Sequence, residues 1–140
     1  MSILNYLLIS HGNFASGLLS SVEIILGKQD SAYAIDMYID EETLEEKVKR
    51  VVNDSNINEQ NLTILTDVFG GSVNQKVIKM FDMSKVKIIT GMNLPMLLEL
   101  FTVDSSQIND EKIKEIITGT RNQVIFVNEQ LNTLDFEDDF

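Results

Sequence analysis

Two separate segments of the chain carry residue types that could do chemistry together. His11, the only histidine in the sequence, follows a short apolar run, and Asp67 with Gly70-Gly71-Ser72 follows another. A neutral imidazole is a nucleophile near physiological pH, and a carboxylate can fix which ring nitrogen carries the proton. Glycines at the start of a helix let backbone N–H groups approach an anion. We therefore predict a site that transfers an anionic group through the imidazole.

The spacing of apolar residues predicts strands and helices in alternation, which would position these two segments. The expected strands are residues 3–10, 32–39, 62–66 and 86–90. The expected helices are residues 14–26, a helix capped by Asp40, residues 73–81, a short helix capped by Asn93 with Pro95 in its first turn, and a helix from about Asp110. This alternation is typical of an α/β fold, a doubly wound, mostly parallel sheet with helices on both faces.

The order of the strands decides whether the candidate residues meet. In an open α/β sheet, ligands bind at the carboxyl ends of the strands, at the point where the strand order reverses. We expect the order 2-1-3-4, because polar and glycine-rich turns follow the first, third and fourth strands. His11 and the turn from Asp67 to Ser72 would then line one crevice, and residues 91–93 would form its far wall.

The composition predicts one acidic domain over residues 1–140, with an acidic tail at about residues 133–140. A net charge of −11 repels phosphate backbones and anionic lipid headgroups, so nucleic acid is not an expected partner. The absence of cysteine excludes disulfides, and a single histidine argues against a zinc site, so no metal or cofactor is expected. No signal peptide and no apolar run of about 20 residues is evident, which predicts a cytoplasmic protein.

Other uses of the same residue types fit the sequence less well. A Ser-His-Asp hydrolase needs its serine on a Gly-x-Ser-x-Gly elbow, and residues 70–74 lack the final glycine. A flavin module needs a Ser/Thr-rich loop after the first strand, and a phosphorylated receiver domain needs paired acids there, which residues 3–13 do not offer. Phosphoryl transfer through His11 remains, with a purely structural histidine as the alternative.

Three motifs, in this order along the chain, resemble those of a known family. They are Leu8-Ile9-Ser10-His11-Gly12 with Phe14-Ala15 and Gly17, Asp67 with Gly70-Gly71-Ser72 and Asn74, and Gly91-Met92-Asn93-Leu94-Pro95-Met96-Leu97. Over residues 3 to 127 the chain is similar to the enzyme IIA component of the mannose-type (mannose, fructose and sorbose) sugar phosphotransferase system. Three motifs in the right order are far more specific than any one of them alone.

The resemblance implies a phosphohistidine carrier. The histidine phosphocarrier protein would phosphorylate His11 at Nε2, and His11 would pass the phosphoryl group to a separate IIB subunit, which works with the membrane subunits IIC and IID. Asp67 would hydrogen-bond the other ring nitrogen. The residues implied around the phosphoryl group are Ser72, Gly70, Gly71, Gly12 and Asn74. Such a carrier is cytoplasmic, or peripheral to the membrane through the transporter complex.

The last third of the chain predicts an assembly. Val124-Ile125-Phe126-Val127 is a short apolar piece that a monomer could use only as an exposed edge strand, and such edges are usually covered or paired. The resemblance implies a homodimer in which this strand is exchanged and lies antiparallel at the sheet edge of the partner subunit.

Two other functions stay open. One is the phosphotransfer subunit of a dihydroxyacetone kinase, which resembles this family in fold and histidine chemistry. The other is a non-catalytic regulatory module that has kept the fold. The turn His11-Gly12-Asn13-Phe14 favours the sugar carrier over the kinase subunit, and the intact His11, Asp67 and Ser72 argue against the regulatory module.

Overall fold

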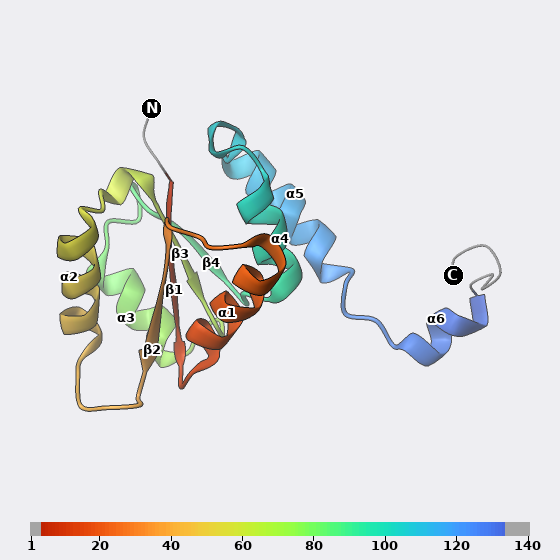
Figure 1. The fold of residues 1–140 in the computed structure, drawn as a ribbon, viewed down its shortest axis with the longest axis horizontal. Coiled ribbons are helices and arrows are strands. Elements are labelled where there is room, and N and C mark those ends of the chain that lie inside the picture. The colour runs from red at the N-terminus through yellow and green to blue at the C-terminus, as the bar shows by residue number, and fades with distance from the viewer. Residues whose placement is uncertain (1–3, 134–140) are drawn as a thin grey trace.

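The computed structural model describes residues 4–133 and has a four-stranded parallel sheet at its centre (Figure 1). The strands are β1 (Asn5–His11), β2 (Ala32–Met37), β3 (Leu62–Thr66) and β4 (Lys87–Thr90). They lie in the order β2-β1-β3-β4, and each neighbouring pair is parallel. The predicted order 2-1-3-4 is therefore confirmed, and the carboxyl ends of β1 and β3 lie side by side.

Helices cover both faces of this sheet, as the alternating pattern predicts. These helices are α1 (Phe14–Leu26), α2 (Leu44–Ser55), α3 (Ser72–Met80), α4 (Leu94–Thr102) and α5 (Asp110–Arg121), with short 3-10 helices at Glu59–Asn61 and Ser105–Gln107. A further helix, α6 (Val127–Thr133), lies apart from the sheet (Figure 1). Figure 1 shows α1, α4 and α5 on one side of the sheet and α2 and α3 on the other. Within residues 4–133, no helix has the length and the hydropathy needed to cross a bilayer.

β1 is apolar along most of its length because both of its faces are covered. Leu7, Leu8 and Ile9 are fully buried, and their side chains alternate between the two faces of the sheet. Leu8 packs under α1, α4 and α5, whereas Leu7 and Ile9 pack under α2 and α3. The chain leaves this core at His11, the exposed last residue of β1. The core thus fixes the strand, and the end of the strand meets solvent.

Two predicted helix starts are confirmed. Asn93 accepts a hydrogen bond from the N–H of Met96 at 2.9 Å, and Pro95 lies in the first turn of α4, where its missing N–H costs least. The helix expected from about Asp110 begins at that residue, and Asn109 is its cap. Side chains that accept the free N–H groups of a first turn therefore mark these starts in the sequence.

The predicted cap of α2 is wrong. Asp40 was the expected cap, but the helix begins at Leu44, and Thr43 accepts the N–H of Glu46 at 3.2 Å. Thr43 and Glu46 have the Thr-x-x-Glu spacing of a capping box, which explains why this position is preferred. Asp40 instead accepts a hydrogen bond from the ammonium group of Lys47 at 3.1 Å.

The strand expected over residues 32–39 is also shorter than predicted, because β2 ends at Met37. Tyr38 has a φ of 67°, in the left-handed region, and this conformation breaks the extended backbone. The resulting turn brings Tyr38 beside His11, with the two ring centroids 5.1 Å apart. The early end of β2 therefore adds an aromatic residue to the carboxyl edge of the sheet.

The C-terminal segment lies apart from the sheet (Figure 1). Residues 124–126 have no regular secondary structure, and α6 begins at Val127. Among residues 4–133, the predicted antiparallel edge strand is therefore not formed within the single chain, and its exchange with a second subunit stays a prediction. Apart from Thr133, the predicted acidic tail lies outside the described residues.

Candidate functional site

The candidate residues converge at the carboxyl ends of β1 and β3. His11 is the last residue of β1, Asp67 directly follows β3, and Ser72 is the first residue of α3. Ile9 pairs with Thr66 in the parallel register, so the two strands end at nearly the same level. The fold therefore brings an imidazole, a carboxylate and the start of a helix together, although they are far apart in the sequence.

Asp67 holds His11 through two contacts with one oxygen. Its Oδ2 lies 2.7 Å from Nδ1 of His11 and accepts the backbone N–H of the same residue at 2.8 Å. Its Oδ1 accepts the N–H of Val68 at 2.9 Å. The side chain of Asp67 is 10% exposed, whereas that of His11 is 47% exposed. The imidazole is thus oriented from its sheltered side and is accessible from the other.

The contacts of Asp67 favour its ionised form. Partial burial raises the pKa of this carboxyl, but hydrogen bonds from the backbone and ring of His11 and from Val68 outweigh that effect and lower the pKa below its usual value. An ionised carboxylate only accepts hydrogen bonds, so we assign the proton of the neutral imidazole to Nδ1. Nε2 then carries the free lone pair that a nucleophile requires.

Ser72 lies on the Nε2 side of the ring. Its Oγ is 3.3 Å from Nε2 of His11. Because Nε2 carries no proton in the assigned tautomer, the serine hydroxyl is the donor in this contact. Ser72 also begins α3, and the first N–H groups of a helix have no partner inside it. An anion attached to Nε2 would therefore meet a hydroxyl and a helix N-terminus.

The glycines of the site allow the backbone turns that follow β1 and β3. Gly12 and Gly70 have φ values of 58° and 77°, in the left-handed region that favours glycine. A Cβ on Gly71 would lie 3.3 Å from the carbonyl oxygen of Val68 and 3.8 Å from Cε1 of His11. The N–H of Gly12 donates to a carbonyl of β2 at 2.8 Å, and that of Gly71 donates to Val68 at 3.2 Å. Gly12 and Gly71 thus shape the site with their own N–H groups already paired.

Asn74, predicted to lie beside a phosphoryl group, has its side chain turned into the core. The residue is 4% exposed, and its Oδ1 accepts the hydroxyl of Thr66 at 3.0 Å. That hydroxyl also lies 2.8 Å from Oγ1 of Thr90. This buried group ties the ends of β3 and β4 to α3, so the side chain of Asn74 supports the helix start. The turn at residues 91–93 is also tied to β3, because the N–H of Met92 donates a hydrogen bond to the carbonyl oxygen of Thr66 at 3.0 Å.

The turn after His11 is fixed by two further side chains. Ser10 accepts the N–H of Ala15 at 2.7 Å, and Asp36 of β2 accepts the N–H and the hydroxyl of Ser16 at 3.1 and 2.5 Å. These three hydrogen bonds hold the first turn of α1 against the ends of β1 and β2. Asp36 is thereby engaged in structure, and no cluster of metal-ligating side chains is found within residues 4–133.

Two residues that the sequence did not single out complete the surroundings of Ser72. The hydroxyl of Tyr38 lies 2.9 Å from Oγ of Ser72, and Nζ of Lys76 donates to the Tyr38 hydroxyl at 3.2 Å. The position of Lys76 could have been inferred from the sequence, because it lies four residues after Ser72, and residues at positions i and i+4 share one face of a helix. Tyr38 carried no comparable signal, since its place depends on where β2 ends.

Solved structures of similar fold come from sugar phosphotransferase systems (PTS). The PTS IIA protein associated with the fucose utilization operon of Streptococcus pneumoniae is 34% identical, with a TM-score of 0.76 over 94% of this chain and 99% of that chain. A phosphoenolpyruvate-dependent sugar PTS permease of Klebsiella pneumoniae is 32% identical, with a TM-score of 0.79 over 92% of this chain and 94% of that chain. The mannose/sorbose specific IIA subunit of Enterococcus faecalis, 22% identical with a TM-score of 0.68 over 96% of each chain, shares the fold.

A family model covers most of the chain. The model of EIIA-man, the PTS system fructose IIA component, matches residues 5–119, which include His11 and the turn from Asp67 to Ser72. Comparison with curated proteins gave no significant match. The match extends from the start of β1 almost to the end of α5, so it includes the whole sheet and both segments of the candidate site. The chain therefore belongs to the EIIA-man family, the mannose-type IIA phosphotransferase components of sugar transport.

Proposed function

We propose that this chain is a phosphohistidine carrier of a phosphoenolpyruvate-dependent sugar phosphotransferase system. The histidine phosphocarrier protein donates a phosphoryl group to Nε2 of His11, and a IIB subunit accepts it for sugar uptake. The observation that carries the proposal is the 2.7 Å contact between Asp67 and Nδ1, which leaves Nε2 as the nucleophilic nitrogen of an exposed ring. Membership of the IIA family supports the same role.

The charges of the ring and the carboxylate suit this transfer. The lone pair of Nε2 attacks phosphorus in line with the bond to the donor nitrogen, and that bond breaks as its electron pair returns to the donor ring. His11 keeps the proton on Nδ1, so its ring gains positive charge when it is phosphorylated. Asp67, 2.7 Å from Nδ1, stabilises that charge. Transfer to IIB breaks the N–P bond and restores the neutral imidazole.

The phosphoryl oxygens need donors that hold them without trapping them. The hydroxyl of Ser72 lies 3.3 Å from Nε2, and Ser72 begins α3, whose first turn offers further N–H donors. An anion at a helix N-terminus gains about 0.3–1 kcal/mol when exposed and about 2 kcal/mol when partly buried. Contacts of this size steady the group during transfer and still let it leave, as a carrier requires.

Labelling from radioactive phosphoenolpyruvate, in the presence of enzyme I and the histidine phosphocarrier protein, tests the proposal. We expect acid-labile label on the wild-type protein, because a phosphoramidate is hydrolysed in acid whereas a phosphoserine is stable. His11→Ala should take no label. Acid-stable label, or label that persists in His11→Ala, would contradict the proposed function.

The phosphoryl acceptor separates the sugar carrier from its nearest alternatives. The labelled protein is offered in parallel to a sugar-specific IIB subunit and to a dihydroxyacetone kinase subunit. We expect loss of label to IIB. Transfer to the kinase alone would assign the chain to dihydroxyacetone phosphorylation, and failure of the wild-type protein to take label at all would favour a regulatory module.

We further propose that the protein is a homodimer. Val124, Ile125, Phe126 and Val127 are 92%, 47%, 64% and 57% exposed in the single chain, although all four are apolar. Pairing of this segment with the sheet edge of a second subunit would remove that surface from water. We expect sedimentation at micromolar concentration to give a dimer for the full chain and a monomer for a chain lacking residues 124–140. A monomeric full chain would remove this claim.

A further inference from the structure

A continuous chain of polar contacts leads away from Nε2 of His11. Oγ of Ser72 is 3.3 Å from Nε2, and the hydroxyl of Tyr38 is 2.9 Å from that Oγ. Nζ of Lys76 is 3.2 Å from the Tyr38 hydroxyl. With Asp67 on the Nδ1 side of the ring, these groups form one line from a carboxylate, through the imidazole, to an ammonium group.

The two ends of this line fix the direction of every hydrogen bond in it. The carboxylate of Asp67 only accepts, and the ammonium group of Lys76 only donates. Lys76 therefore donates to Tyr38, Tyr38 donates to Ser72, and Ser72 donates to Nε2. Both hydroxyl hydrogens thus point along the line toward Nε2. A phosphoryl group on Nε2 would replace the ring lone pair with oxygens that accept such hydrogens.

Tyr38 is held beside the ring by an uncommon backbone conformation. Its φ of 67° lies in the left-handed region, which residues with a side chain rarely adopt. Its ring lies 5.1 Å from that of His11, with the two planes inclined by 34°, and the residue is 49% exposed. Hydrogen bonds that Ser72 and then Lys76 would donate to the deprotonated oxygen lower the pKa of Tyr38. A more acidic phenol is also a better hydrogen-bond donor. Tyr38 therefore presents its hydroxyl to the site and is not a core residue.

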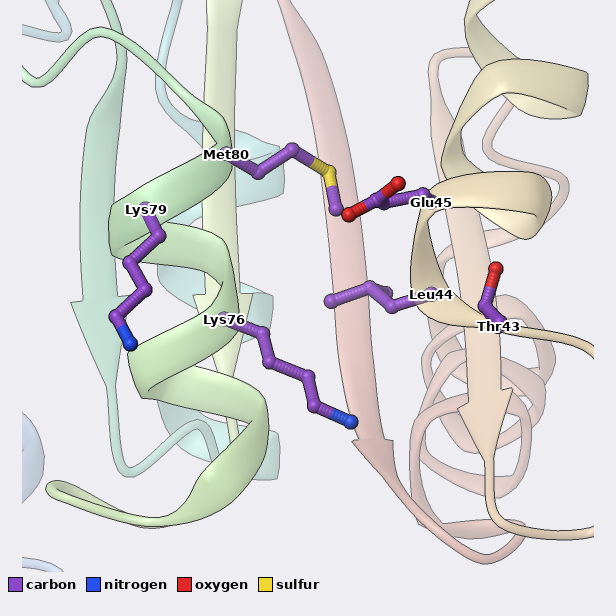
Figure 2. A pocket seen from close by; sticks show the side chains of 6 residues that line it. All are labelled: Thr43, Leu44, Glu45, Lys76, Lys79 and Met80. Atoms are coloured by element: carbon purple, nitrogen blue, oxygen red, sulfur yellow. The ribbon is translucent and has the colours of Figure 1, made fainter.

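Lys76 reaches the site from a groove between α2 and α3. Figure 2 shows its side chain extending from α3 toward the end of β1, while the side chain of Lys79 runs along α3 in the same view. The groove is lined by Thr43, Leu44, Glu45, Lys76, Lys79 and Met80. The chain carries a net charge of −11, so a cation at this place offsets repulsion of an incoming phosphoryl group.

Building on the proposed function, we propose that Tyr38 donates its O–H to an oxygen of the phosphoryl group on Nε2 of His11, and that Lys76 positions and polarises Tyr38. Tyr38 is a phosphoryl-binding residue in this account, and Lys76 is a positioning residue that acts through it. The phenol keeps its proton throughout, so the N–P bond forms and breaks as before. The contact strengthens as charge develops on the phosphoryl oxygens during transfer.

Tyr38→Phe and Lys76→Met, each in the full-length protein, test this proposal. The rate of transfer from the histidine phosphocarrier protein and the phosphorus NMR resonance of phosphorylated His11 are measured. We expect transfer about tenfold slower in Tyr38→Phe, because a hydrogen bond to a charged group is lost. Lys76→Met should be about threefold slower, since the contact that it removes is exposed. Both variants should move the phosphorus resonance, which a merely structural role would leave in place.

Two further variants serve as controls. Lys79→Met removes the same charge from the same helix and should leave the rate and the resonance unchanged, and Lys76→Arg keeps a donor and should restore the wild-type values. Wild-type behaviour of both Tyr38→Phe and Lys76→Met overturns the inference and leaves the proposed function intact. Equal losses in Lys76→Met and Lys79→Met also overturn it, since they would reflect surface charge alone. A wild-type protein without acid-labile label contradicts the proposed function and this inference with it.

If Tyr38→Phe fails to fold, the comparison of Lys76→Met with Lys79→Met still tests the proposal. Lys76 and Lys79 both lie on the exposed part of α3, so replacing either leaves the core contacts of the helix unchanged. A slower transfer in Lys76→Met than in Lys79→Met, together with a shifted phosphorus resonance, supports the contact with Tyr38. Identical values for the two lysine variants contradict it.

Discussion

The two sides of the imidazole of His11 are built differently. On the Nδ1 side, a carboxylate that is 10% exposed makes contacts of 2.7 and 2.8 Å with a single residue. On the Nε2 side, exposed Ser72 and Tyr38 make contacts of 3.3 and 2.9 Å. A short, sheltered contact with a charged group fixes geometry, whereas exposed contacts rearrange at little cost. The Nδ1 side therefore holds the ring in every state, and the Nε2 side can open for the attack and close again around the phosphoryl oxygens.

Asp67→Asn should disrupt the contacts on the Nδ1 side and have the largest effect. One amide oxygen cannot replace both carboxylate oxygens, because Oδ2 serves His11 while Oδ1 accepts the N–H of Val68. The amide would also favour the wrong ring tautomer. We expect phosphoryl transfer to slow by about a hundredfold to ten-thousandfold, by analogy with other carboxylates that orient a reactive histidine. Rapid-quench transfer kinetics measure the effect.

A matched substitution shows whether the effect belongs to the site. Asp54→Asn removes the same charge from an exposed position of α2 and should transfer at the wild-type rate. Circular dichroism should show that both variants fold. If Asp67→Asn transfers within twofold of Asp54→Asn, the account of the Nδ1 side is wrong.

Ser72→Ala should weaken the contacts on the Nε2 side and have a smaller effect. The substitution removes the hydroxyl 3.3 Å from Nε2 and also its contact with Tyr38, but it leaves the N–H groups of α3 in place. We expect transfer about tenfold slower, the loss of one of several donors to the phosphoryl oxygens. Single-turnover transfer from the phosphorylated donor measures it. A loss as large as that of Asp67→Asn would show that the two sides do not differ as described.

Gly71→Ala probes how tightly the turn after β3 is packed. The φ of Gly71 suits alanine, but the new Cβ would lie 3.3 Å from the carbonyl oxygen of Val68, so the turn must shift slightly. We expect a several-fold slower transfer and a small loss of stability. Gly17→Ala is the control, because its Cβ would meet no atom within 4 Å and alanine stabilises a helix interior by about 0.5–1 kcal/mol. Equal transfer rates in the two variants would show that the turn has room to spare.

Acid should remove the contribution of Asp67 to folding. The pKa of this carboxyl is lower in the folded protein than its ordinary value of 3.8, so on acidification the unfolded chain takes up the proton first. The stability that Asp67 contributes is therefore complete above the ordinary pKa and is lost as the pH falls through the folded pKa. We expect the difference in free energy of unfolding between the wild type and Asp67→Asn, from urea titrations, to be constant near neutral pH and to shrink below about pH 4. A difference that does not shrink below about pH 4 would contradict the assigned contacts.

The part of the site that rests on the sheet could be predicted from the sequence. β1 is buried on both faces, so it reads as a continuous apolar run that ends at His11. Asp67 and Ser72 flank a glycine-rich turn after a second such run. Parallel strands place their carboxyl ends at one edge, so these local patterns were enough to bring His11 and Asp67 together.

The remaining features depend on contacts that a local pattern does not contain. Asp40 and Thr43 are both good caps by type, and the Thr-x-x-Glu spacing decided between them. The resemblance implies Asn74 beside the phosphoryl group, and no local pattern predicts that its side chain accepts a hydrogen bond from Thr66 in the core. Tyr38 lies in the site because its backbone has a φ of 67°, and an aromatic residue in an apolar run gives no signal of that conformation.

The central claim is that Asp67 keeps the proton on Nδ1 of His11 and so directs the phosphoryl group to Nε2. Nitrogen-15 NMR of the protein labelled in its single histidine, recorded before and after phosphorylation, tests this most directly. We expect the free protein to carry its ring proton on Nδ1, and the phosphorylated protein to keep that proton while Nε2 couples to phosphorus. A phosphorus coupling at Nδ1, or a free ring protonated on Nε2, would contradict the account.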